Sequence, residues 1–178
     1  MPAYDKAIIQ QHLAAADAGV IRAVKGRAFE DLVCYLFGMV PGLINPIRNK
    51  MNTFQTEEVD VAFYNDQEPH GLRGFNQILL IECKNWSKPV GSMEVNWFIT
   101  KIRNRGIDFG ILVAANSVTG DAHDKTAAHA VVSAALAANV RLIIITRTEL
   151  ENLNSSDDLV SLIREKVCQL VVTGTVWP

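Results

Sequence analysis

The chain has 178 residues, 49% of them hydrophobic and 20% charged, with a formal net charge of −2 at pH 7. This size suits one domain with a full hydrophobic core, and the composition argues against a disordered binding segment. Proteins that bind DNA non-specifically usually carry a strong basic balance, which is absent here. Any role on nucleic acid must therefore rest on local features.

The cysteines and the apolar runs bear on the compartment. Cys34, Cys83 and Cys168 are odd in number, far apart and never in C-x-x-C, which disfavours a disulfide framework and a zinc cluster. No apolar run approaches the roughly 18 residues of a membrane span. Residues 1–19 lack the pattern of a signal peptide and resemble an amphipathic helix. We expect a cytoplasmic protein without membrane contact, in which this helix precedes a single domain over 20–178.

The first half of the chain predicts a helix followed by two neighbouring strands. Over 20–40 apolar residues recur at helical spacing and form one stripe, which comprises Phe29, Leu32, Val33, Leu36, Phe37 and Val40. The segment VPGLINP (40–46) breaks this helix. EEVDVAFY (57–64) alternates apolar and polar residues and predicts a half-buried strand. The polar turn NDQEPHGLRG (65–74) leads to a second strand over 78–84, so we expect an antiparallel pair.

The second half predicts alternating helices and buried strands, in the order helix 92–105, strand 109–115, helix 121–138, strand 140–146 and a last helix within 155–170. We expect Ser92 to cap the first of these helices, Gly106 to end it, and Thr119 and Asp121 to cap the next. Helices between strands allow parallel crossovers. The whole order predicts an α/β domain with helices on both faces of a mixed sheet.

An acid and a base follow the apolar run of the second predicted strand. Glu82 and Lys84 lie two residues apart and therefore on one face, and strand pairing would bring Asp60 close to Glu82. Two neighbouring carboxylates repel each other unless a proton or a cation lies between them. Mg²⁺ suits such oxygen ligands, and a nearby lysine can stabilise negative charge during phosphodiester cleavage. These residues predict metal-assisted phosphodiester hydrolysis.

Asp60 followed by Glu82-Cys83-Lys84 resembles the D…E-x-K signature of the PD-(D/E)XK nuclease superfamily. More narrowly, the chain resembles the restriction-endonuclease-like, Mrr-type branch. The segment KGRAFEDLVCYLF is similar to the first helix of that branch, whose G-x-x-F-E motif supplies a further acid, here Glu30. The resemblance extends over about 26–153.

The resemblance implies a restriction-endonuclease-like three-layer fold and a metal-dependent deoxyribonuclease, an endonuclease of DNA restriction, defence or repair. It implies Asp60, Glu82, Lys84 and Glu30 as catalytic residues. Mg²⁺, with Mn²⁺ as a substitute, would be held by the three acids and the backbone carbonyl of Cys83. Two positions depart from the pattern of the branch: Val59 replaces the proline before the aspartate, and relatives often carry glutamine where this chain has Glu82.

The same residues have simpler interpretations. Glu82 and Lys84 could form an ion pair at a strand end, an arrangement that contributes little stability at the surface. Asp60 could be a half-buried, hydrogen-bonded strand residue, and Glu30 could lie on a solvated helix face. Glu58 shares the face of Asp60 and is the substitute acid.

The other conspicuous side chains receive structural interpretations. Cys83, Trp86 and Trp97 are expected to pack in the core. Six basic residues are expected on solvated helix faces, with phosphate contact as the alternative: Arg22, Lys25, Arg27, Lys101, Arg103 and Arg105.

Two other classes of function stay open. A catalytically inactive nuclease fold could act as a scaffold, although it would not need the four site residues. A structure-specific, junction-resolvase-like nuclease would need a dimer with two active sites. No helix-turn-helix or zinc finger is visible in the sequence. We therefore expect a protein partner or a homodimer to supply specificity for DNA.

Overall fold

The computed structural model describes residues 2–19, 21–121, 123 and 126–176. Its centre is a five-stranded sheet in the order β1-β2-β3-β4-β5. The strands are Leu43–Met51 (β1), Glu58–Asn65 (β2), Ile78–Lys84 (β3), Phe109–Ala114 (β4) and Arg141–Thr146 (β5). β1, β2 and β3 pair antiparallel, whereas β3, β4 and β5 pair parallel. The predicted mixed sheet, with its antiparallel part first, is confirmed.

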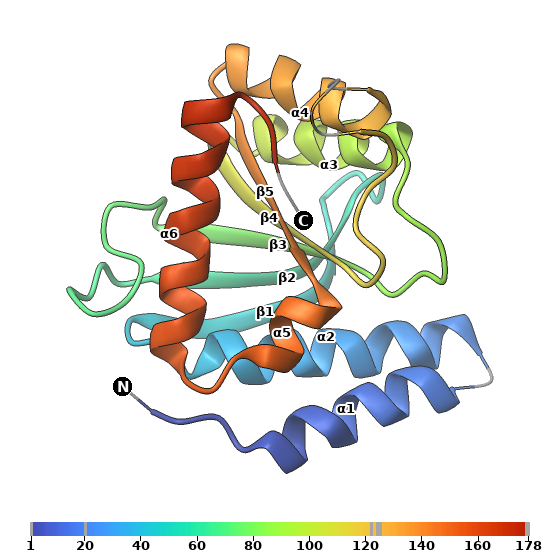
Figure 1. Cartoon of the computed structure of the whole chain (residues 1–178), viewed down its shortest axis with the longest axis vertical. Helices are drawn as coiled ribbons and strands as arrows, with labels where there is room; N and C mark the ends of the chain where they lie inside the picture. Colours follow the sequence, from blue (N-terminus) through green and yellow to red (C-terminus); the bar gives the residue numbers. More distant parts are fainter. Residues whose placement is uncertain (1, 20, 122, 124–125, 177–178) are drawn as a thin grey trace.

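Helices cover both faces of this sheet (Figure 1). They are Lys6–Ala18 (α1), Arg22–Gly38 (α2), Ser92–Asn104 (α3), Ala127–Ala137 (α4), Arg147–Asn152 (α5) and Ser156–Thr173 (α6). On one face α2 and α6 contact each other, and Phe37 of α2 stacks on Phe63 of β2. On the other face α3 contacts β4, and α4 contacts α3 and β5. The three-layer α/β architecture of a restriction-endonuclease-like fold is therefore confirmed.

A close helix–strand approach sets the position of α3. A side chain on Gly110 of β4 would place its Cβ 2.4 Å from Cδ1 of Ile102, so glycine lets the helix lie directly against the strand. Val95, Phe98 and Ile99 complete the buried side of α3. The helix therefore packs directly on β4.

The segments before and after the sheet core contact each other. α1 packs on α2, and Ile9 and Leu13 are buried there. Ala3 forms a β-bridge with Ser155, and the Tyr4 N–H donates to the Asn154 carbonyl at 2.8 Å. Arg147 of α5 also pairs with Asp17 of α1 at 2.6 Å.

Strand β1 was not predicted, and its irregular backbone explains why. The register with β2 shifts between Ile44 and Ile47, and Pro46 lies within the shift. Asn45 and Asn49 have positive φ, which breaks the alternation of a regular strand. An edge strand tolerates both features because one of its sides has no strand partner.

Several predicted helix ends were wrong. Ser92 is the first residue of α3 and Gly91 is its N-cap, so Ser92 does not cap the helix. α4 begins at Ala127 after an N-cap at Thr126, not at Asp121. Gly106 does end α3, with φ at +67°. The short helix α5 was not predicted; its capping box pairs Thr146 with Glu149.

None of the helices in the described part of the chain has the length and apolar character that a bilayer crossing requires. All three cysteines are free thiols.

Candidate active site

The β2–β3 hairpin brings two carboxylates together. Val61 pairs with Ile81, and the same register taken one residue further sets Asp60 opposite Glu82. Asp60 Oδ2 accepts a hydrogen bond from the Cys83 N–H at 2.8 Å. Both acids therefore lie at the same end of the hairpin, as the sequence predicts.

Asp60 is an unusually weak acid. Burial, and after it the negative charge of Glu82, raise its pKa from 3.8 to about 6. The Cys83 N–H and the charges of Lys84 and Lys101 offset only part of this effect. The surrounding groups therefore compensate the negative charge of the Asp60 carboxylate only in part. A bound cation would compensate the rest.

Glu82 is held by two lysines from different elements. Its carboxylate is only 4% exposed. Oε1 accepts from Nζ of Lys84 at 2.7 Å, and Lys101 Nζ lies 3.0 Å from Oε1 and 2.7 Å from Oε2. An ion pair this buried depends on its partners far more than an exposed pair does. Glu82 and Lys84 do form the ion pair of the simpler interpretation, but Glu82 is buried, so the pair does not lie at the surface.

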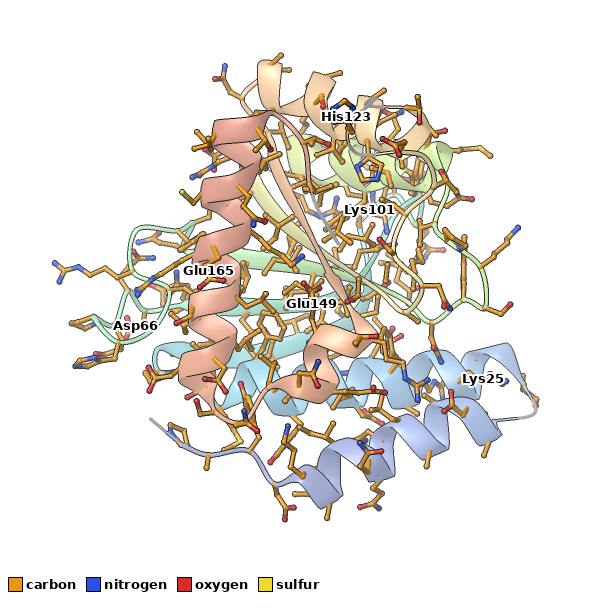
Figure 2. All side chains as sticks on the ribbon, viewed as in Figure 1. Lys25, Asp66, Lys101, His123, Glu149 and Glu165 are labelled. Atoms are coloured by element: carbon orange, nitrogen blue, oxygen red, sulfur yellow. The ribbon has the colours of Figure 1, made fainter. Side chains whose placement is uncertain are left out.

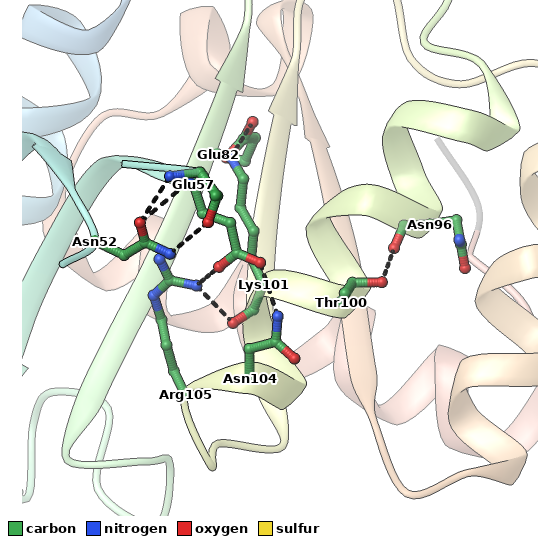
Figure 3. A network of polar contacts seen from close by, with 9 residues as sticks. Asn52, Glu57, Glu82, Asn96, Thr100, Lys101, Asn104 and Arg105 are labelled. Atoms are coloured by element: carbon green, nitrogen blue, oxygen red, sulfur yellow. Dashed lines mark hydrogen bonds and ion pairs between the residues drawn. The ribbon is translucent and has the colours of Figure 1, made fainter. Parts of the chain in front are cut away.

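Lys101 is the site residue that the sequence analysis missed. It was expected on a solvated face of α3, but it is 5% exposed and reaches from α3 to Glu82 (Figures 2 and 3). Lys101 follows Phe98 by three residues and precedes Ile102, and both of these are buried. Lys101 thus lies at the edge of the apolar face of α3, one turn after Phe98, and a charge buried there needs a partner; this position is the signal that could have revealed it.

A second ion pair fixes the helix that carries Lys101. Glu57, just before β2, is 7% exposed and accepts from Arg105 at 2.6 Å and from Asn104 at 2.7 Å. The hydrogen bond from Arg105 is the main reason that the pKa of Glu57 is lowered. Arg105 also donates to the Lys101 carbonyl at 3.0 Å (Figure 3). Arg105, expected on a solvated face, thus anchors α3 to the start of β2.

Lys84 stays protonated in this setting. Burial alone would lower its pKa, but the ion pair with Glu82 and the charge of Asp60 outweigh burial, and the net shift is upward. An ammonium group so stabilised is a donor of positive charge and hydrogen bonds rather than a base. The ammonium also lies 5.9 Å from the centre of the Trp86 ring.

Glu30 of α2 contacts residues of β1 rather than the carboxylate pair. Its Oε2 accepts from Asn49 at 2.9 Å and from Arg48 at 3.4 Å, both on β1. No hydrogen bond joins Glu30 to Asp60 or Glu82 in the described residues. Asn49 lies between the Arg48–Val61 and Lys50–Val59 pairs and therefore opposite Asp60. Asn49, which donates a hydrogen bond to Glu30, thus lies opposite Asp60 in the strand pairing, and it is the residue that links Glu30 to Asp60.

The carboxylate pair suits a divalent ion in its chemistry. Mg²⁺ is usually bound through one or two carboxylates, with waters and substrate phosphate oxygens completing its shell. Asp60 and Glu82 supply two, with the raised pKa of Asp60 marking the uncompensated charge. Within the described residues, no group of three or more His, Cys, Asp or Glu side chains is arranged to hold a metal ion. Glu58 is exposed on β2 and joins no such group.

Two pockets meet at Lys84 and Trp86. One, of about 640 Å³, runs toward the start of α2 and includes Lys25 and Lys88 in its wall. The other, of about 330 Å³, runs along α3 and includes Glu82 and Trp97. Trp86 and Cys83 are partly buried against the core, as expected, whereas Trp97 is 50% exposed. The expectation that Trp97 packs in the core is wrong.

Comparison with known protein families identifies a family for most of the chain. The model of a restriction endonuclease family, the Mrr catalytic domain, matches residues 21–153. A comparison with curated proteins found no match. The match includes α2, the β2–β3 hairpin and α3, and hence every residue of the site described above. The chain therefore belongs to the Mrr-type restriction endonuclease family.

Proposed function

We propose that the protein is a metal-dependent deoxyribonuclease, an endonuclease that hydrolyses DNA phosphodiester bonds in restriction, defence or repair. The observation that carries this proposal is the pairing of Asp60 with Glu82 beside a protonated Lys84. Acidic groups with shifted pKa values cluster at functional sites. A protein that acts only as a scaffold does not require a carboxylate with a raised pKa beside a buried ion pair.

In this proposal Asp60 and Glu82 hold Mg²⁺ or Mn²⁺, with Glu30 and the Cys83 carbonyl as further candidate ligands. The ion would supply charge stabilisation for the scissile phosphate and activation of water. In the reaction an oxygen–phosphorus bond forms from water and the ester bond to the leaving oxygen breaks.

The chain's own residues supply the positioning. Lys84 presents a positive charge at the mouth of both pockets, where it can stabilise negative charge on the phosphate in the transition state. Glu82 keeps the Lys84 ammonium in place through its 2.7 Å contact. Lys101 fixes Glu82 in turn, and a preorganised charge of this kind costs no rearrangement during the reaction.

Specificity is proposed to come from a protein partner or from self-association. The net charge of −2 gives the chain little general attraction for DNA phosphates. Cytoplasmic location remains an expectation, in keeping with its free thiols.

The test is cleavage of supercoiled plasmid, linear duplex and single-stranded DNA, each with Mg²⁺, Mn²⁺ or EDTA. Glu82→Gln and Lys84→Ala should each lower cleavage by at least about 100-fold, the scale of losing one charge-stabilising group. Glu58→Gln and Lys50→Ala change exposed residues on β2 and β1 and serve as matched controls. Equal cleavage in EDTA, or normal cleavage by Lys84→Ala, would refute the proposal.

A further inference from the structure

One side of α3 presents large apolar groups to solvent next to the candidate active site. Met93 is 77% exposed and Trp97, one helical turn later, is 50% exposed. The buried side of the same helix carries Val95 and Phe98. The core therefore does not require Trp97, and an exposed tryptophan beside a polar site points to a binding role.

Trp97 belongs to the same pocket as the catalytic groups. The pocket of about 330 Å³ is walled by Trp86, Trp97 and Met93 on its apolar side and by Glu82 and Lys84 on its polar side. Its volume lies at the lower end of the range of about 300 to 1,000 Å³ for small-molecule sites. Such a pocket suits a flat, aromatic group rather than an extended one.

The polar requirements of a nucleobase are also met at the rim. Asn96 lies in the wall of this pocket, and its exposed side chain carries both a donor and an acceptor for base edges. Trp97, which is half exposed, offers a ring face on which any base can stack, and Trp86, whose ring lies under the Lys84 ammonium, borders the same pocket. The chemistry of the pocket therefore matches a base without selecting one base in particular.

The larger pocket differs in charge. Lys25, Lys84 and Lys88 contribute to its wall, and Lys25 lies near the beginning of α2 (Figure 2). Phosphate groups of a nucleic acid contact such cations, whereas bases stack on aromatic rings. Lys84, Trp86 and Glu94 line both pockets, so phosphates in one and a base in the other would meet at the candidate catalytic lysine, with the Glu94 carboxylate beside them.

We propose that the pocket of Trp86, Met93 and Trp97 is a nucleobase site, which holds an unpaired base next to the scissile phosphate. The inference rests on the proposed nuclease function and names its substrate class. A base in intact duplex is stacked and paired and must be extruded before it can enter a pocket. The preferred substrate is therefore single-stranded DNA, or duplex DNA that contains unpaired bases.

Binding tests the site without metal or cleavage. A 12-nucleotide oligothymidine and a blunt 12-base-pair duplex, which has no unpaired bases, are titrated in EDTA, with intrinsic tryptophan fluorescence and anisotropy of a labelled strand as readouts. We expect oligothymidine to bind more tightly than duplex and to quench tryptophan emission. Trp97→Ala should weaken oligothymidine binding about 10-fold, the scale of losing one stacked base. Trp97→Phe should keep most of the affinity, because its ring still stacks.

Phe54→Ala is the matched control, since Phe54 is an aromatic residue 83% exposed in the turn between β1 and β2. It should leave oligothymidine binding unchanged. Unchanged binding by Trp97→Ala, or equal losses in Trp97→Ala and Phe54→Ala, would overturn the nucleobase site.

Cleavage with Mn²⁺ separates this inference from the nuclease proposal. Wild-type protein should cut single-stranded DNA or a bubble duplex faster than intact duplex, and Trp97→Ala should reduce that preference. If all substrates are cut equally and Trp97→Ala has no effect, the base site is wrong and the nuclease stands. If no substrate is cut but oligothymidine still binds through Trp97, the nuclease proposal fails and the base site stands.

Discussion

Replacement of Lys101 by methionine examines the buried ion pair at Glu82. Methionine keeps the length and apolar stem of the side chain, so it removes the charge while preserving most of the packing of α3. Lys101 is 5% exposed and Glu82 4% exposed, so the variant leaves a buried carboxylate with one cation in place of two. Removing one partner of a buried pair costs about 3 to 5 kcal/mol. Because Lys84 remains 2.7 Å from Glu82, we expect the lower end, about 3 kcal/mol.

Urea unfolding in EDTA at pH 7 measures this loss. With a slope of about 2 kcal/mol per molar urea, typical of small proteins, the midpoint should fall by about 1.5 M. Arg103→Met is the matched control, since Arg103 is an exposed base on the same helix and its change should cost under about 0.5 kcal/mol. A Lys101→Met midpoint equal to that of Arg103→Met would show that the Lys101–Glu82 contact does not stabilise the fold.

A double-mutant cycle isolates the contact itself. Glu82→Gln removes the carboxylate charge and leaves Lys101 buried without its ion pair, so it should also be destabilising. In the combined Glu82→Gln, Lys101→Met variant neither buried charge of the pair remains, and the total loss should be smaller than the sum of the single losses. Simple additivity would contradict a direct interaction between the two side chains.

Two further predictions concern the charge at Asp60 and its response to metal. Because the pKa of Asp60 is raised from 3.8 to about 6, the ionised carboxylate lowers the stability of the folded protein. This loss of stability is absent below pH 3.8, grows as the pH rises, and reaches its full size above pH 6. Asp60→Asn should therefore raise the free energy of unfolding of the metal-free protein by up to about 3 kcal/mol at pH 7.5, and by less at pH 5. Urea unfolding at both pH values measures the two gains. A larger gain at pH 5 than at pH 7.5 would contradict the prediction. Mn²⁺ should raise the melting temperature of the wild type through mass action and should raise that of Asp60→Asn less. It should raise that of Lys101→Met more, because only Lys84, in place of two lysines, then competes for Glu82. Differential scanning fluorimetry across a Mn²⁺ series measures all three, and a wild-type curve indifferent to Mn²⁺ would argue against a shared metal site.

The part of the site that lies on regular strands could be predicted from sequence. Alternation within β2 and the polar turn after it place Asp60 and the β3 residues Glu82 and Lys84 at one end of a hairpin. Strand pairing with period two then decides which side chains share a face. The alternation of side chains within a strand and the turn between two adjacent strands are local features, so periodicity alone was enough to predict the positions of these residues.

The remaining parts depend on contacts between distant segments. In the sequence Lys101 is one of several basic residues on a predicted helix. Its contact with Glu82 depends on the packing of α3 against Gly110, which lies in a different element. β1 carries Pro46 and two asparagines with positive φ, so its pattern is typical of a loop, and pairing with β2 determines its conformation. Trp97 lies on the side of α3 opposite Val95 and Ile99, so helical spacing could have indicated its exposure.

The contacts between the two ends of the described chain have a consequence for how the domain can be divided. The family match ends at residue 153, but Ala3 pairs with Ser155 and Tyr4 with Asn154 just beyond it, and α1 and α6 each pack on α2. A fragment cut at the family boundaries would expose the surfaces of α2 and β5 that these two helices bury. The part of the chain that the family model matches therefore packs against flanking segments that lie outside it in sequence.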